Sequence, residues 1–159
     1  MLKSTSLIAA AIFVTVSCSK QEEIMEQNIN YIVFGHFYGF CVGEDCIEIF
    51  KLTDSKLFED DLDSYPTSQS PYEGNYVEMD EEKFLLVREL ADKIPEDLLV
   101  IQDTVIGSPD ASDGGGIYFA INNENGTRYW LIDQMKNNIP NNLHSFIDEI
   151  NQYISLVSE

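Results

Sequence analysis

The chain has 159 residues, and its 28 acidic residues outnumber its 9 basic residues, which gives a formal charge of −19 at pH 7. A charge of this sign and size repels nucleic acids and anionic membrane surfaces and attracts cations and basic proteins. The length is typical of one domain with its own core, so we expect a single domain and no nucleic-acid partner.

The N-terminal segment has the pattern of a secretory signal. Lys3 supplies one positive charge, and a run of small and apolar residues follows from Leu7 to Val16. This run is shorter than the roughly 20 apolar residues that span a bilayer, and polar residues follow it at once. We therefore expect residues 1–17 to be a cleaved signal peptide and residues 18–28 to be a polar tether.

The end of this segment, Thr15-Val16-Ser17-Cys18, resembles the lipobox of bacterial lipoproteins. The resemblance implies that Cys18 carries lipid, palmitate included, and anchors the mature chain in the cell envelope, on the periplasmic or surface side of the outer membrane. Thr15 stands where the family usually has Leu, so ordinary signal-peptidase cleavage after Ser17 or Ser19 is the alternative. The remaining chain is similar in arrangement to small exported bacterial domains of unassigned function, and this second resemblance implies no activity.

A β-hairpin is predicted over residues 31–51. Residues 31–40 are rich in β-branched and aromatic side chains, and a strand pattern resumes at Ile47 after a short turn. Cys41 and Cys46 flank this turn, and with Cys18 assigned to lipid they are the two cysteines that remain for a disulfide. His36 suggests a metal site with them, but its spacing of five from Cys41 puts the two residues on opposite faces of a strand. A disulfide is therefore favoured over a metal site.

Residues 53–79 are acidic and rich in turn-forming residues, and they predict a loop with one short strand near Tyr76. Asp80 is the expected N-cap of a helix whose apolar stripe runs to Ile94 and which Pro95 ends. Another turn of helix after Pro95 and a short strand within residues 100–106 are expected to follow.

The last third of the chain holds the clearest patterns. A glycine-rich loop over residues 107–116 leads into a hairpin of residues 117–121 and 128–132, whose turn carries Asn125-Gly126. Apolar residues from Leu143 to Val157 repeat at spacings of three and four and predict an amphipathic helix. We therefore expect one α+β domain over residues 29–159, in which two principal helices pack on a mostly antiparallel sheet of 4–6 strands, in the order β-β-α-β-β-α.

No strong catalytic motif is present. The chain lacks a nucleophile elbow, a phosphate-binding glycine loop with Lys and a His-Glu-x-x-His helix, and its two histidines, His36 and His144, are expected to be a packed residue and a solvent-exposed one. The spacing of Asp110, Ser112 and Asp113 departs from a calcium loop. No metal or other cofactor is expected.

Two functions follow as hypotheses. The first is a noncatalytic binding or interaction module that is held at the membrane through Cys18 and that binds a basic protein, such as an enzyme that degrades cell walls. The alternative is a small envelope hydrolase with an unfamiliar site near Asp110–Gly116.

Overall fold

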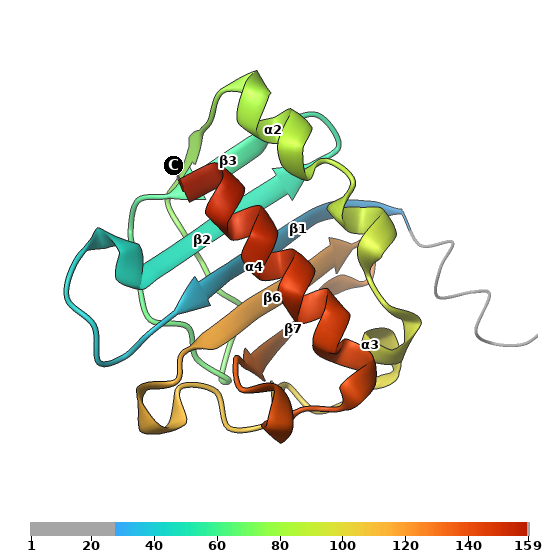
Figure 1. Cartoon of the computed structure of the whole chain (residues 1–159). Helices are drawn as coiled ribbons and strands as arrows, with labels where there is room; N and C mark the ends of the chain where they lie inside the picture. The colour runs from blue at the N-terminus through green and yellow to red at the C-terminus, as the bar shows by residue number, and fades with distance from the viewer. Residues whose placement is uncertain (1–27, 159) are drawn as a thin grey trace, which may run out of the picture.

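The computed structural model describes residues 28–158, and these form one α+β domain built on a single sheet (Figure 1). The expected signal peptide, Cys18 and nearly all of the tether lie outside the described residues. The strands are β1 (Ile29–Phe37), β2 (Ile47–Thr53), β3 (Leu57–Asp60), β4 (Tyr76–Glu78), β5 (Val105–Ile106), β6 (Gly116–Asn123) and β7 (Gly126–Asp133). Their order across the sheet is β4-β3-β2-β1-β6-β7-β5, and only the β5–β7 pair is parallel.

Strand β1 is central, as its sequence suggests. It pairs antiparallel with β2 on one side and with β6 on the other, so both of its edges are hydrogen-bonded. Both of its faces are buried as well, because Phe34 lies in the core on one side of the sheet and Val33 in the core on the other. This double burial explains why the strand carries apolar side chains almost continuously rather than at alternate positions.

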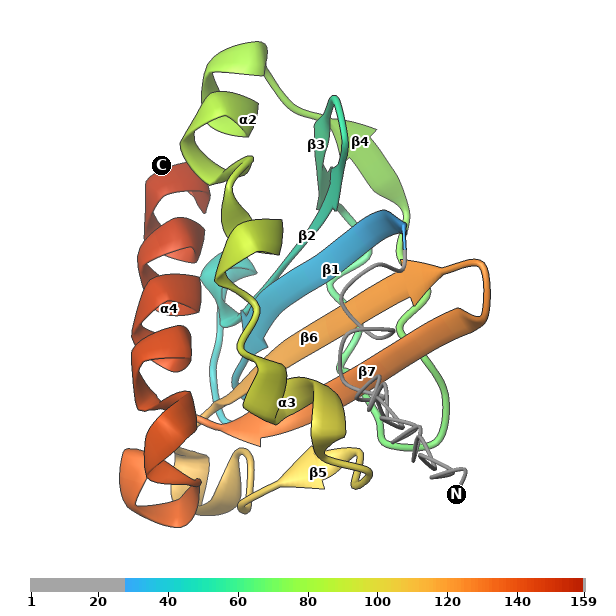
Figure 2. The ribbon, with the colours of Figure 1, turned by 90° about the vertical axis from the view of Figure 1, so that its right-hand side faces the viewer.

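The helices cover one face of the sheet (Figures 1 and 2). They are α2 (Glu81–Val87), α3 (Glu96–Val100) and α4 (His144–Ser158). The longest, α4, packs against β1 and α2 and buries Phe146, Ile147, Ile150, Ile154 and Val157, which confirms the predicted amphipathic helix. Within residues 28–158, no helix has the length and apolar character that a membrane span requires.

The loop over residues 61–75 covers the other face of the sheet. Its Tyr65 ring packs edge-on against the Phe37 ring, with 5.1 Å between the ring centres. The backbone N–H of Tyr72 donates to the hydroxyl of Tyr118 at 2.8 Å. The hydroxyl of Tyr129 donates to the carbonyl of Ser68 at 3.0 Å. These contacts close a second, smaller core between the loop and the sheet.

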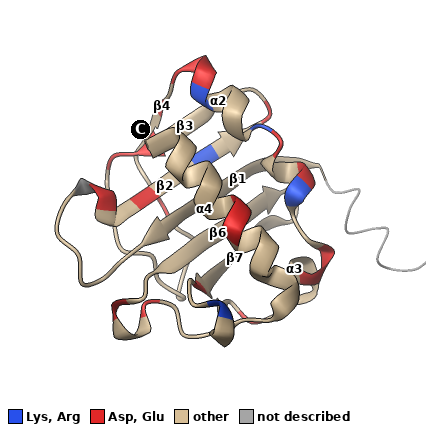
Figure 3. Cartoon of the chain, viewed as in Figure 1, with Lys and Arg blue, Asp and Glu red and all other residues tan. Residues whose placement is uncertain are grey.

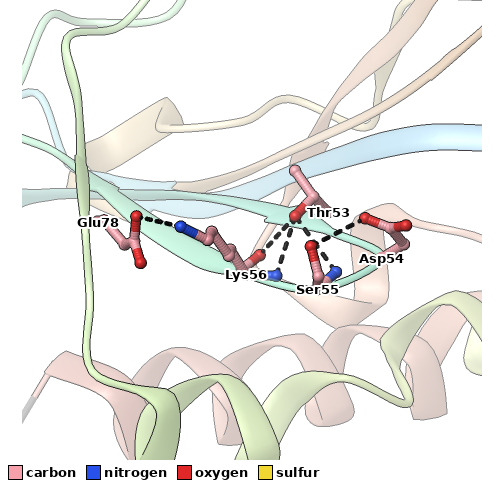
Figure 4. A network of polar contacts seen from close by, with 5 residues as sticks. All are labelled: Thr53, Asp54, Ser55, Lys56 and Glu78. Carbon is pink, nitrogen blue, oxygen red and sulfur yellow. Dashed lines mark hydrogen bonds and ion pairs between the residues drawn. The ribbon is translucent and has the colours of Figure 1, made fainter.

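The tight turn between β2 and β3 is held by its own side chains (Figure 4). The hydroxyl of Thr53 donates to the carbonyl of Lys56 and accepts from the N–H of the same residue, each at 3.0 Å. The ammonium of Lys56 then pairs with Glu78 of β4 at 2.6 Å. The turn therefore fixes the position of the edge strand as well as its own hairpin.

The α+β class and the single sheet are as predicted, but the sheet has seven strands instead of 4–6. The strand that the sequence pattern did not predict is β3, which lies between β2 and the edge strand β4 and whose four residues include two acids, too few apolar positions to show an alternating pattern. The helix expected from Asp80 to Ile94 ends at Val87, and its apolar spacing continues in a separate 3₁₀ turn, Leu90–Lys93. The strand expected within residues 100–106 is confined to Val105–Ile106, because α3 extends to Val100.

Candidate functional site

The connection between β1 and β2 is a loop closed by a disulfide. The two strands pair as far as Phe37 and Ile47, so residues 38–46 form the loop, which is longer than the short turn expected from the sequence. Cys41 and Cys46 are bonded, with their Cα atoms 5.6 Å apart, and the predicted disulfide is confirmed. It does not join paired strand positions, and instead it braces the 38–46 loop itself.

The tip of the 38–46 loop exposes two apolar side chains. Phe40 is 86% exposed and Val42 is 103% exposed, whereas Phe37, three residues before Phe40, is almost fully buried. Single exposed apolar residues are ordinary on protein surfaces, but here two flank a cysteine on a covalently closed loop that projects from the sheet (Figure 1). This arrangement is typical of a surface that contacts another molecule.

The base of the 38–46 loop is anchored at several points. The N–H of Tyr38 donates to the carbonyl of Cys46 at 2.9 Å, and Nε2–H of His36 donates to the carbonyl of Asp45 at 3.0 Å. The N–H of Gly39 donates to Asp110 Oδ2 at 2.8 Å. The exposed tip is therefore presented by a fixed base, which lowers the conformational entropy that the loop would lose on binding.

Acidic side chains gather beside the 38–46 loop. Burial raises the pKa of Glu48 to about 7, and the charges of Glu59, Asp45 and Asp63 raise it further, while a hydrogen bond with Ser158 opposes the shift. The hydrogen bond with Ser158 places Glu48 on the side of the sheet where α4 ends. Figure 3 shows acidic residues on β2 and at the end of the loop in this region. The apolar tip thus has an acidic border.

Basic residues balance this border only in part. The described residues contain two ion pairs, Lys56–Glu78 and Lys136–Asp148, both with partly exposed side chains. The first lies at the end of β2 away from the loop, and the second lies near the start of α4, whereas the acidic border lies near its end. Lys83 reaches this end of α4, where its Nζ donates to the carbonyl of Val157 at 2.6 Å, so the acidic border is balanced in part.

Glu48 provides a test of this crowding. We expect Glu48→Gln to stabilise the fold by about 1 kcal/mol at pH 8 and to have no effect near pH 4, allowing for partial solvent screening. Below the unfolded-state pKa of 4.5 the carboxyl of Glu48 is protonated in both the folded and the unfolded state. As the pH rises from 4.5 to about 7, only the unfolded state loses this proton, so the unmodified protein loses stability over this window. Glu48→Gln has no proton to lose and is therefore the more stable protein above it.

Urea unfolding of Glu48→Gln and of Glu81→Gln, an exposed glutamate in the first turn of α2, would measure the difference. An equal effect of Glu48→Gln at both pH values would contradict a raised pKa.

Asp110 of the segment Asp110–Gly116 has a structural role. Its Oδ2 accepts from the N–H of Gly39 and from the hydroxyl of Tyr65, both at 2.8 Å, and its Oδ1 accepts from the N–H of Gly115 at 3.2 Å. The carboxylate thereby joins three separate segments of the chain. In the part of the chain that the structure describes, no group of three His, Cys, Asp or Glu side chains could hold a metal ion.

The two histidines contact different parts of the molecule. Burial lowers the pKa of His36, against the opposing effects of the hydrogen bond to Asp45 and its charge, so the ring is neutral at pH 7. His144 is half-buried rather than solvent-exposed, and its Nε2–H donates to the carbonyl of Lys136 at 2.8 Å, where it fastens the turn before α4. Each ring is thus bonded to a backbone carbonyl.

Sequence reasoning placed Phe40 in the aromatic strand and left Val42 in a turn. The sequence does contain a signal for the exposure of Phe40. Phe40 lies between Gly39 and Cys41, and a disulfide-closed turn can begin before the run of aromatic residues is over, as it does here, where pairing ends at Phe37. In comparisons with known proteins, no family model, no curated protein and no solved structure matches this chain.

Proposed function

We propose that this chain is a membrane-anchored exported lipoprotein whose domain is a noncatalytic binding module for a basic protein, with the 38–46 loop as the docking surface. The observation that carries the proposal is the exposure of Phe40 and Val42 on a disulfide-braced loop with an acidic border.

Physical principles favour this combination for protein recognition. Aromatic residues, Phe included, are enriched in the buried centre of interfaces, where binding energy concentrates in a few residues, and charged residues at the rim steer the encounter and select the partner. Here the anchors are Phe40 and Val42, and the rim includes Asp45 and, once it is ionised above about pH 7, Glu48. The partner therefore has an apolar pocket with a basic border.

The anchor is tested at Cys18. We expect Cys18→Ala, in the full chain, to move the protein from the membrane fraction to the soluble fraction and to remove the mass of the acyl chains, because more than one buried chain is needed for stable anchoring. Fractionation and intact-mass measurement would show this. Continued membrane association with a mass changed only by the substitution would contradict lipidation.

The binding role is tested by capture on the immobilised protein. At low salt, we expect retention of a defined basic protein from the exported fraction of the producing cell, and we expect that retention to weaken as salt screens the acidic border. Retention supports the proposal only if it is lost when Phe40 and Val42 are both replaced with serine. An empty capture at low salt would contradict the proposal.

A further inference from the structure

A cleft of about 750 Å³ lies at the end of β1 opposite to the 38–46 loop. It is bordered by the start of β1 at Ile29, by the β6–β7 hairpin and by the segment from Ala91 to Leu99. The volume is in the range of sites that hold small molecules, which are mostly apolar and carry a few polar groups that fix the ligand's orientation.

The lining of the cleft has this composition. Apolar side chains are contributed by Ile94, Leu99, Ile121 and Trp130, and polar side chains at the hairpin by Asn125 and Thr127. Arg128 and Asp92 are the charged residues among those of the described chain that line it. A ligand in this cleft would therefore meet apolar surface, the Arg128 cation on the β6–β7 hairpin and the Asp92 carboxylate on the opposite segment.

Arg128 is held in place by backbone carbonyls and an aromatic ring. Its guanidinium donates to the carbonyl of Leu99 at 2.5 Å and to that of Ile101, and it lies 4.9 Å from the centre of the Trp130 ring. No ion pair joins it to any carboxylate of residues 28–158. Burial lowers the pKa of this guanidinium. In a chain with three times as many acids as bases, a half-buried arginine that forms no ion pair within residues 28–158 is an unusual feature.

The two hydrogen bonds of Arg128 to backbone carbonyls leave other N–H donors of its guanidinium group available for a ligand. A guanidinium has five N–H donors, and two carbonyls do not use all of them. Carboxylate and sulfonate groups match the fork and form charge-assisted hydrogen bonds, which are stronger than neutral ones. We infer that the cleft binds a small organic anion, with its acidic group at Arg128 and its apolar body on Ile94, Leu99 and Trp130.

This inference does not depend on the proposed protein partner, because the cleft and the 38–46 loop lie at opposite ends of β1. A pair of dyes tests it: anilinonaphthalene sulfonate, which is anionic, and N-phenylnaphthylamine, its uncharged analogue. Trp130 is the only tryptophan of the chain, so energy transfer from it reports that a dye is bound to the domain, and the variants at Arg128 then show whether the dye lies in the cleft.

In the full chain, we expect the anionic dye to bind at least as tightly as the neutral one, despite the charge of −19. Arg128→Gln should weaken the anionic dye about tenfold and leave the neutral dye within about twofold. Arg88→Gln, which removes an exposed arginine outside the cleft, should change neither.

Arg128→Lys keeps the positive charge and covers the case in which Arg128→Gln fails to fold. It keeps the charge but loses the guanidinium fork, so the anionic dye should bind to it more weakly than to the unmodified chain and more tightly than to Arg128→Gln. Binding of the anionic dye to Arg128→Lys that is no tighter than to Arg128→Gln, an equal loss of both dyes from Arg128→Gln, or no energy transfer from Trp130 in the unmodified chain would each overturn the inference.

Discussion

Replacing Asp60 with alanine is expected to lower the free energy of unfolding by about 3–5 kcal/mol, the range for removing a buried carboxylate and leaving its donors unpaired. Asp60 is only 3% exposed. Its Oδ2 accepts from the hydroxyl of Tyr72 at 2.5 Å and from the N–H of Asp63 at 3.1 Å, and its Oδ1 accepts from the N–H of Asn75. One carboxylate therefore fixes both ends of the 61–75 loop.

The loss should extend beyond these bonds, because the 61–75 loop covers one face of the sheet. Burial raises the pKa of Tyr72, and the hydrogen bond to Asp60 raises it further, so the phenol stays a donor at neutral pH. Without its acceptor the loop would detach from Tyr118 and Tyr129, and the smaller core would be open to water.

Urea unfolding of Asp60→Ala, with Asp103→Ala as the control at an exposed aspartate, would measure the effect. Asp60→Asn should fall between Asp60→Ala and the unmodified chain, because an amide keeps one acceptor oxygen. If Asp60→Ala unfolds within about 1 kcal/mol of the control, the 61–75 loop does not depend on this carboxylate.

Long, regular patterns predicted the fold most accurately. The helix α4 and the β6–β7 hairpin were recognisable because many residues repeat one period or because an Asn-Gly pair marks the turn. The short strand expected near Tyr76 is β4, whereas β3 was not predicted, since it has four residues and two of them are acidic. Asp60 carries no local sign of burial, because its partners come from positions up to fifteen residues away.

The candidate sites were less predictable than the fold. The disulfide followed from two cysteines around a turn, but the exposure of Phe40 depends on where β1 and β2 stop pairing, which is a property of the whole sheet. The Arg128 cleft forms where the β6–β7 hairpin meets a segment about thirty residues earlier, and no local pattern indicates such a meeting.

Replacing Phe40 and Val42 together with serine is expected to weaken binding of the basic partner by about 30-fold to 1,000-fold, which corresponds to about 2–4 kcal/mol for hot-spot anchors. The fold should be unaffected, because both side chains are exposed and neither belongs to a core. The expected effect is therefore on the dissociation rate and not on the unfolding midpoint.

Leu85→Ser combined with Leu86→Ser is the matched control. This pair is also exposed, at 48% for each side chain, and lies on α2 rather than on the loop. Asp45→Asn supplies a second comparison, since removing a rim charge should reduce the salt dependence of binding more than the affinity at high salt.

The most direct test of the central claim is the dissociation constant of the captured basic protein, measured for the full chain, the Phe40/Val42 double variant and the Leu85/Leu86 double variant at matched salt. The account predicts that the first double variant loses at least 30-fold in affinity and that the second stays within about threefold of the unmodified chain. Equal affinities of the two double variants would contradict a docking role for the 38–46 loop.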